Sequence, residues 1–303
     1  MIGFFADPYP DELLYSACGR YAKRTNYLNK QSVVTELFGK RGLSAIIDFP
    51  TRLRYFVSLL PPGNNYSVNK LIDENTIFPF HLPFLPIKRA KIVREEMKQE
   101  NNNRLHTRLG TRAKQIKYPE FLRYCPNCVI EDREIYGEAY WHRIHQLAGI
   151  LTCPNHKCFL SESPIEIGSM SSSHFHDTET SLPSILPKAV MLNFEDRNHK
   201  ILHKLACDAK WLLSQNKLLI GGKIIRERYF NILLKQGHAY YNGRIRHNKL
   251  LQDSQKFLSN ELLDMIGRIS KRDNWISSLA QPGNINITYH PIRHLLLLTF
   301  LGL

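Results

Sequence analysis

Cys125-Pro126-Asn127-Cys128, followed 24 residues later by Cys153-Pro154-Asn155-His156, is the stretch of sequence that decides the fold. Each half is a Cys-x-x-ligand turn built on a proline, and we call the two turns the first and the second knuckle. Two such knuckles can direct four sulfur or nitrogen donors at one ion, which is the set that tetrahedral zinc prefers. Four protein ligands leave no place for an activated water. The spacing therefore predicts a structural Zn²⁺ bound by Cys125, Cys128, Cys153 and His156.

Three neighbouring residues could replace one of these donors, namely Cys158, His142 and His145. His156 is favoured because it completes the second knuckle. Ordinary buried cysteines beside a surface histidine are the alternative without a metal, and paired spacing in a chain of this length argues against it. The segment 140–146 between the knuckles is interpreted as a strand or helix that packs Trp141 and Ile144 beside the metal.

Several motifs make the sequence resemble the TniQ/TnsD family, the target-site selectors of Tns-type transposons. They are RYCPNC at 123–128, YGEAYW at 136–141 and CPNH at 153–156, together with FADPYPDELLYS at 5–16 and PIRHLL at 291–296. The resemblance is most specific over residues 1–160. Full-length TnsD proteins are longer, so the resemblance implies the N-terminal portion of a TnsD-like protein or a short member of the family.

The resemblance implies a non-catalytic protein that binds double-stranded DNA at a chromosomal attachment site beside an essential gene. It also implies recruitment of a TnsC-like AAA+ regulator ATPase, which then activates the transposase subunits. A guide-RNA branch of the same family is a second possibility, because its members dock on a CRISPR surveillance complex and do not read DNA sequence. The basic residues near the C-terminus argue against that branch.

Composition favours an anionic partner and a reducing compartment. Lys and Arg number 41 against 27 Asp and Glu, a net charge of +14 that suits nucleic acid, with a membrane surface or mere solubility as the competing explanations. Three cysteines, Cys18, Cys158 and Cys207, remain after the metal is assigned, so a disulfide framework is not expected. The start of the chain lacks a basic n-region, and the apolar run 295–303 is shorter than the roughly 20 residues that span a bilayer. We expect a cytoplasmic, nucleoid-associated protein without a membrane segment.

Hydrophobic periodicity predicts a mainly α fold, with helical helix-turn-helix-type domains around a zinc-finger module and little β structure. With 303 residues and 43% hydrophobic content, the chain can bury a core in two domains. The expected division is an N-terminal helical domain (1–120), a zinc-finger module (121–165), a linker rich in Ser, Thr and Pro (166–195) and a C-terminal helical domain (196–303). One helix is expected after Pro10, one after Pro86 and one at the end of the chain. The other expected helices occupy residues 29–38, 51–60, 201–213, 224–234, 244–258, 260–269 and 275–279.

Two basic segments are predicted to contact DNA. Arg104, Arg108 and Arg112 recur at four-residue spacing, with Lys114 nearby, and would form a stripe on a helix that leads into the first knuckle. A solvated helix face is the competing interpretation for any single arginine.

The second segment lies between residues 223 and 249, which contain seven basic residues and one acid, Glu227. The helix predicted from residue 244 would begin with four basic side chains, Arg244, Arg246, His247 and Lys249. Cations at a helix N-terminus oppose the helix dipole, so the pattern indicates an anionic ligand and a recognition helix, although the preceding turn is longer than usual.

A zinc-braced nuclease is the alternative from another functional class, with His142 or His145 as general base. Such an enzyme would need a second, open metal site, for which the nearby acids Glu131, Asp132, Glu134 and Glu138 are candidates by proximity. No Gly-x-x-x-x-Gly-Lys phosphate-binding loop occurs in the sequence, so ATPase activity is expected of the partner.

Overall fold

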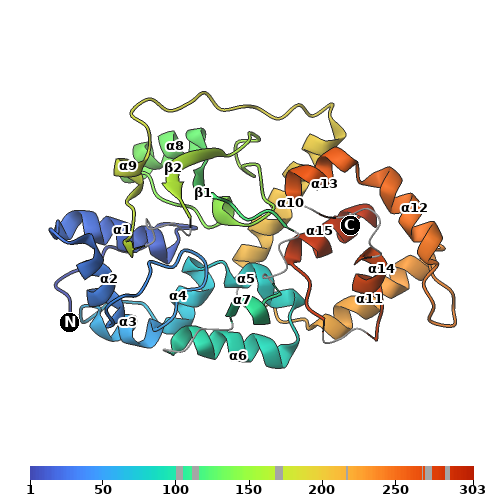
Figure 1. The fold of residues 1–303 in the computed structure, drawn as a ribbon, viewed down its shortest axis with the longest axis horizontal. Helices are drawn as coiled ribbons and strands as arrows, with labels where there is room; N and C mark the ends of the chain where they lie inside the picture. Colours follow the sequence, from blue (N-terminus) through green and yellow to red (C-terminus); the bar gives the residue numbers. More distant parts are fainter. Residues whose placement is uncertain are drawn as a thin grey trace.

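A computed structural model describes residues 1–99, 105–110, 116–167, 173–215, 218–267, 269, 275–283 and 287–303. The N-terminal helices lie at one end of an elongated, mainly helical body, and the helices that precede the C-terminus lie at the other (Figure 1). Within those ranges the sheet structure is one pair of strands. The predicted mainly α fold with little β structure is confirmed. No described helix combines the length and hydrophobicity needed to cross a bilayer.

Short helices build the N-terminal part, and their ends follow local sequence signals. The helix predicted at 29–38 begins where the Asn29 side chain accepts a hydrogen bond from the Gln31 amide, and it ends at Gly39 with a φ of +70°. Before the first strand lie α1 (Leu14–Thr25), α2 (Lys30–Phe38), α3 (Leu53–Leu59), α4 (Val68–Asn75), α5 (Phe78–His81), the 3-10 helix η1 (Leu82–Phe84), α6 (Ile87–Lys98) and α7 (Leu105–Arg108).

The two strands flank the segment that carries both knuckles. Strand β1 (Phe121–Tyr124) pairs antiparallel with β2 (Ser161–Glu166), and Arg123 lies opposite Glu162. Between them the chain forms α8 (Pro126–Tyr136) and the 3-10 helix η2 (Ile144–Gln146), and after β2 comes α9 (Thr178–Ser181). From α9 the chain crosses the top of the molecule in an extended path to α10 (Figure 1). The predicted linker is therefore partly helical, and residues 168–172 within it lie outside the described part of the chain.

The C-terminal part consists of helices close to those expected from periodicity. They are α10 (Arg197–Ser214), α11 (Gly222–Lys235), α12 (His247–Phe257), α13 (Asn260–Ile266), α14 (Trp275–Ala280) and α15 (Pro291–Phe300). Helices α11 and α12 both pack against α14, and α10 packs against both α5 and α15. Helix α10 thus connects the N-terminal and C-terminal parts.

Buried hydrophobic side chains form one connected cluster that reaches from Ile2 to Leu301. Gly149, in the loop between the knuckles, lies so close to the C-terminal part that an added Cβ would meet Ile292 at 2.9 Å and Ile266 at 3.3 Å. The regions expected to be separate domains therefore share a core. The proposed division into four regions remains a prediction.

Candidate metal centre and basic surfaces

The first knuckle is formed where β1 passes into α8. Cys125 occupies the N-cap position of α8 and Pro126 its first position, where a missing amide hydrogen costs nothing and the ring fixes a helical φ. Cys128 then falls in the first turn of the helix. The strand, the proline and the helix together direct both thiols to the same side.

The second knuckle is a tight turn. The Cys153 amide donates to the carbonyl of Cys158 at 2.8 Å, and the Lys157 amide donates to the carbonyl of Cys153 at 3.1 Å. An isolated bridge pairs Thr152 with Phe159 across the base of the turn. The backbone hydrogen bonds therefore hold Cys153 and His156 on one loop that faces the first knuckle.

The four predicted donors come together in three dimensions. His156 Nδ1 lies 3.5 Å from Cys125 Sγ, 3.2 Å from Cys128 Sγ and 3.6 Å from Cys153 Sγ. All four donor atoms lie within 4.8 Å of one another, so the group could hold a metal ion. A zinc ion with sulfur at about 2.3 Å and nitrogen at about 2.0 Å separates its ligand atoms by about 3.5 to 3.8 Å at the tetrahedral angle. The distances of 3.2 to 3.6 Å from His156 Nδ1 to the three sulfurs, and of 3.7 Å between the sulfurs of Cys128 and Cys153, are close to that geometry.

The protonation states expected for the clustered thiols of Cys125, Cys128 and Cys153 also favour the binding of a cation. Hydrogen bonds from Cys128 and Cys153 lower the pKa of the Cys125 thiol, whereas the hydrogen bond that Cys128 makes to Cys125 raises the pKa of the Cys128 thiol. Packing three thiols together therefore favours a single thiolate. A divalent cation would supply the positive charge that allows the others to ionise.

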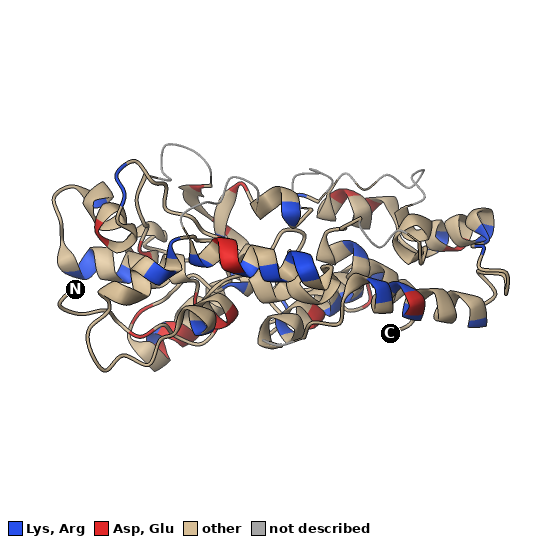
Figure 2. Ribbon diagram, turned by 90° about the horizontal axis from the view of Figure 1, so that it is seen from below, with Lys and Arg blue, Asp and Glu red and all other residues tan. Residues whose placement is uncertain are grey.

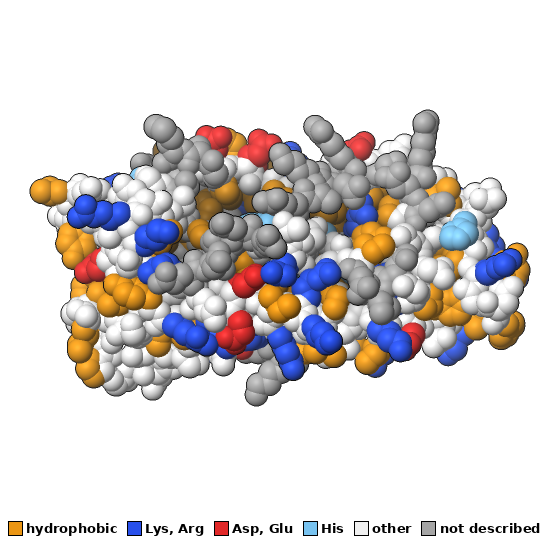
Figure 3. All heavy atoms as spheres, turned by 60° about the horizontal axis from the view of Figure 1, so that its bottom comes forward, with side chains coloured by type: hydrophobic (Ala, Val, Ile, Leu, Met, Phe, Trp, Pro, Cys, Tyr) orange, Lys and Arg blue, Asp and Glu red, His pale blue; other side chains and the backbone are white. Residues whose placement is uncertain are grey.

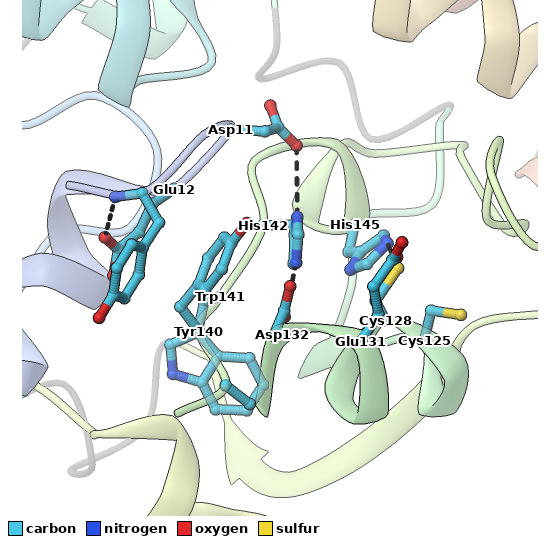
Figure 4. Close-up of polar contacts among 12 residues, drawn as sticks. Asp11, Glu12, Cys125, Cys128, Glu131, Asp132, Tyr140, Trp141, His142 and His145 are labelled. Atoms are coloured by element: carbon cyan, nitrogen blue, oxygen red, sulfur yellow. Dashed lines mark hydrogen bonds and ion pairs between the residues drawn. The ribbon is translucent and has the colours of Figure 1, made fainter. Parts of the chain in front are cut away.

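The three alternative donors occupy different positions around the cluster. Cys158 Sγ lies 3.4 Å from Cys125 Sγ, too far for a disulfide, in which the sulfurs are about 2.05 Å apart. His145 Nε2 lies 3.9 Å from Cys128 Sγ. His142 points away from the sulfurs and lies between Asp11 and Asp132 (Figure 4). Cys158 and His145 are thus neighbours of the cluster, and His142 belongs to a separate row of polar groups.

That row connects the loop between the knuckles to the start of the chain. His142 Nε2 lies 2.9 Å from Asp132 Oδ2, and its Nδ1 lies 3.9 Å from Asp11 Oδ2. Burial lowers the pKa of His142, but the hydrogen bond and the charge of Asp132 outweigh it and leave that pKa above the ordinary value. His145, beside it, has a pKa well below the ordinary value, chiefly because it is buried. The two histidines therefore favour opposite charge states.

Trp141 and Ile144 are buried, as the sequence interpretation required. The Trp141 backbone amide donates to Ser16 Oγ at 3.0 Å, and its indole Nε1 donates to the carbonyl of His176 at 2.9 Å. Periodicity identified α1 as a core helix. It did not predict the hydrogen bond between Ser16 of α1 and this loop, since nothing in the sequence indicates which distant group a single helical serine will contact.

The first predicted DNA-binding segment is only partly described. Arg104, Arg112 and Lys114 lie outside the described residues, so the stripe that they would form stays a prediction. Arg108 ends α7, and its Nε lies 2.8 Å and 3.1 Å from the two carboxylate oxygens of Glu96. This ion pair balances the charge of Arg108 within the protein.

The second predicted segment is exposed, but its helix begins later than expected. Arg244, Arg246, His247 and Lys249 are all exposed. The helix begins at His247 and not at Arg244, because residues 238–246 form a β-hairpin. The Tyr240 amide donates to the carbonyl of Arg244, and the Arg246 amide donates to the carbonyl of His238, both at 2.8 Å. Hairpin pairing thus replaces the first helical turn and explains the long connection from α11.

A further basic surface lies on α6 and α11. The start of α11 packs against the start of α6, since an added Cβ on Gly221 would meet the Ile87 side chain at 3.2 Å. Both helices lie along the lower side of Figure 1, and Lys and Arg recur on the face seen from below in Figure 2. Figure 3 shows basic side chains spread along this side of the surface, with few acidic ones among them. The exposed basic residues on these helices are Lys88, Lys91, Lys223, Arg228 and Lys235.

Comparison with known proteins gives matches on both sides of the linker. The family model described as TniQ matches residues 4–160, which is more than half of the chain. The model described as Tn7-like transposition protein D matches residues 205–303. One relative is the transposon Tn7 transposition protein TnsD of Escherichia coli, 32% identical over 152 residues. That match takes in 50% of this chain and 30% of the relative, so the matched part is less than a third of that protein's length.

Proposed function

The chain belongs to the TniQ/TnsD family, and from that premise we propose that it selects the target site for transposition by binding double-stranded DNA. In this proposal Cys125, Cys128, Cys153 and His156 bind one structural Zn²⁺. The protein marks a chromosomal attachment site and recruits a TnsC-like AAA+ regulator ATPase, which in turn engages the transposase subunits.

One observation carries the DNA-binding part of the proposal, namely the exposed basic group at the start of α12. Arg244, Arg246, His247 and Lys249 all face solvent, and residues 228–252 contain no aspartate or glutamate. Arg246 is the N-cap residue of α12, and the first turn of that helix has no acidic residue. A helix N-terminus with cations beside it favours phosphate, because the free amides and the side chains attract the same charge. The proposal therefore directs the start of α12 toward a DNA groove.

The metal would act on this function indirectly. The cluster joins β1 and α8 to the second knuckle, and the loop between the knuckles packs against the C-terminal part through Gly149. Zinc at this point would fix the arrangement of the N-terminal and C-terminal parts, because ligand binding fixes both knuckles at once. DNA would then contact basic side chains held in one fixed arrangement.

Two observations support a role without catalysis. His145 is 1% exposed, so it has no access to an attacking water. Both ring nitrogens of His142 face carboxylates, Nε2 at 2.9 Å from Asp132 and Nδ1 at 3.9 Å from Asp11, and the raised pKa of the ring favours the protonated form, which cannot accept a proton. A general base must be within hydrogen-bond reach of the proton that it removes. Incubation of supercoiled plasmid with the protein and Mg²⁺ should therefore give no cutting, and cutting that His145→Ala abolishes would favour the nuclease.

The direct test is binding of fluorescent duplexes that carry the chromosomal attachment site, with a shuffled duplex of the same composition as the control. We expect tighter binding to the attachment site, with an affinity that falls steeply as salt is raised. Removal of the metal by a chelator should weaken binding to both duplexes. Equal affinity for the two duplexes at moderate salt would contradict sequence reading and favour the guide-RNA branch of the family.

Recruitment of the ATPase needs a separate test. Purified TnsC-like ATPase with ATP would be added to the protein on the attachment-site duplex, and a larger complex is expected by size-exclusion chromatography. The same mixture without this chain gives the background assembly of the ATPase on DNA. An unchanged profile would remove recruitment from the proposal and leave DNA binding intact.

A further inference from the structure

The hairpin 238–246 protrudes from the molecule between α11 and α12. An isolated bridge pairs Ala239 with Ile245, and Gly243 makes the turn with a φ of +86°. In Figure 1 it extends outward at the end of the body remote from the N-terminus. A protruding hairpin next to an exposed helix start can reach a partner that the helix itself contacts.

The base of this hairpin is fastened to the C-terminal helices. His238 Nε2 lies 2.9 Å from Asp253 Oδ2 on α12, and the Lys249 ammonium donates to the carbonyl of Gly237 at 3.3 Å. Gln236, just before the hairpin, donates from Nε2 to the carbonyl of Leu301 at 3.0 Å. Ala239 and Ile245 are buried. These contacts fix the direction of the hairpin relative to α12.

The tip, in contrast, presents its side chains to solvent. Tyr241 is 95% exposed and Tyr240 is 47% exposed. The Arg246 guanidinium lies 4.2 Å from the centroid of the Tyr240 ring, and Arg244 is exposed beside them. An aromatic ring with a polar end, placed in solvent on a fastened turn, is typical of a binding surface and contributes nothing to the core.

The charge around the tip selects the class of partner. Residues 228–252 have five lysines and arginines and no acid, and Asp253, the first carboxylate after them, is engaged by His238. A basic segment without acids, with aromatic rings between its cations, is suited to nucleic acid, where cations meet phosphates and rings meet sugars or bases. The start of α12 belongs to the same surface.

Resting on the proposed function, we propose that hairpin 238–246 is a second DNA-contacting element, which lies along the minor groove beside the major-groove segment that α12 faces. Tyr241 contacts the sugars of that minor groove, and Arg244 and Arg246 contact the phosphates that border it. The minor groove is about 6 Å wide and carries few sequence signals. The hairpin therefore senses groove width and increases affinity, whereas α12 reads bases.

Hydroxyl-radical footprinting tests this assignment, because the radical cuts at sugars accessible in the minor groove. The duplex would be one recovered from a random-sequence pool by selection with the full wild-type chain. We expect wild-type protein to protect a short patch that Tyr241→Ala loses, while protection elsewhere stays unchanged. Affinity should fall by about tenfold for Tyr241→Ala, and Tyr241→Phe should retain most of the binding.

The phosphate contacts are tested by the salt dependence of the DNA affinity. Arg244→Ala should lower the slope of log affinity against log salt by about one, since one phosphate contact releases about one counterion. Ile185→Ala and Lys188→Ala serve as controls, because both residues are exposed on the extended segment before α10. Neither control should change the footprint or the slope. Far-ultraviolet circular dichroism would show that each variant remains folded.

The possible outcomes distinguish a failure of the hairpin assignment from a failure of the proposed DNA-binding function. Wild-type protection that Tyr241→Ala and Arg244→Ala leave unchanged would overturn the role of the hairpin and leave DNA binding intact. If the wild-type chain selects and protects no duplex, both the proposed function and the hairpin assignment fail.

Discussion

Arg20 donates two hydrogen bonds to the carboxylate of Glu12, of 3.0 and 2.8 Å, in a site where both side chains are almost completely buried. Ser16 Oγ donates to the same carboxylate at 2.7 Å, and Arg20 also reaches Glu138 in the loop between the knuckles at 3.1 Å. The ion pair therefore joins the first helix to the metal module. The two buried charges compensate each other, so neutralising either residue alone would leave the other charge buried without a partner and would lower the unfolding free energy.

Glu12→Gln should be strongly destabilising. The substitution keeps the shape of the side chain but leaves the buried Arg20 charge without its main partner, which costs about 3 to 5 kcal/mol of unfolding free energy. Urea denaturation followed by circular dichroism would measure the loss. The matched control is Glu95→Gln, since Glu95 pairs with Arg54 at 3.1 Å on an exposed surface. That control should change the unfolding free energy by less than about 1 kcal/mol, and equal losses would contradict the buried link.

Gly149→Ala should destabilise the protein more than Gly137→Ala. Both glycines have a positive φ, +76° and +78°, so alanine costs about 1 to 2 kcal/mol at either position. At Gly137 the space around an added Cβ is open, whereas at Gly149 it would meet Ile292 at 2.9 Å. The difference between the variants therefore measures the close packing around Gly149, where Ile116 and Ile266 also lie within 3.3 Å of the added Cβ. We expect an additional loss of about 1 to 3 kcal/mol for Gly149→Ala, and melting temperatures of the two variants that coincide would argue against close packing there.

Local signals predicted much of the structure. The spacing of the two knuckles correctly predicted that Cys125 and His156 lie close together. The capping residue Asn29 and the terminating Gly39 correctly predicted the ends of α2. Arg20 and Glu138 are 118 positions apart in the sequence, and hydrophobic periodicity cannot predict a contact between such distant residues. An arginine on the apolar face of α1 is the one hint that the sequence offers.

One corrected helix boundary and one untested DNA contact illustrate the same physical limit. The apolar spacing at 244–258 fits a helix, but it does not distinguish a first helical turn from a paired strand, and residues 244–246 are paired in the hairpin. The spacing of Arg108 gave no information about its partner, because Glu96 approaches it from another helix. Sequence periodicity identifies the buried side of an element. Tertiary contacts decide where the element begins and which charges remain available.

The protein should lose stability as the pH falls from about 7 to about 5, in part because of His290. Burial, followed by the charges of Arg293 and His294, lowers the pKa of His290 to about 3. Below the unfolded pKa of about 6.5 the unfolded chain binds a proton that the folded chain does not, so stability falls as pH falls. Each such histidine contributes about 1.4 kcal/mol per pH unit across that window.

His290→Asn isolates this effect. His290 caps α15 by accepting a hydrogen bond from the Ile292 amide, and asparagine can keep that cap without titrating. The variant should show a smaller decrease in urea-unfolding free energy between about pH 7 and pH 5 than the wild type. Both proteins have the same metal centre, so loss of metal at low pH affects both equally. Identical pH profiles would show that His290 does not limit stability in acid.

Removal of the metal should unfold the region around the knuckles. A structural zinc site has no preformed geometry in the unfolded chain, so its binding energy becomes folding energy. Cys153→Ser should lower the zinc content measured by elemental analysis from one ion per chain to nearly none. The melting temperature should fall with it, as it should for wild-type protein treated with a strong chelator. Full zinc content in the Cys153→Ser protein would contradict the predicted ligand set.

The identity of the fourth donor can be decided with three further variants. His156 Nδ1 lies between the three predicted sulfurs, whereas Cys158 Sγ lies 3.4 Å from one of them, Cys125 Sγ. His156→Ala should therefore release the metal, and Cys158→Ser should retain it. Cys207→Ser is the matched control, because that thiol is exposed on α10 and is not one of the four clustered donors. If Cys158→Ser released zinc and His156→Ala kept it, Cys158 would be the fourth donor, and His156 would lie beside a site made of four thiolates.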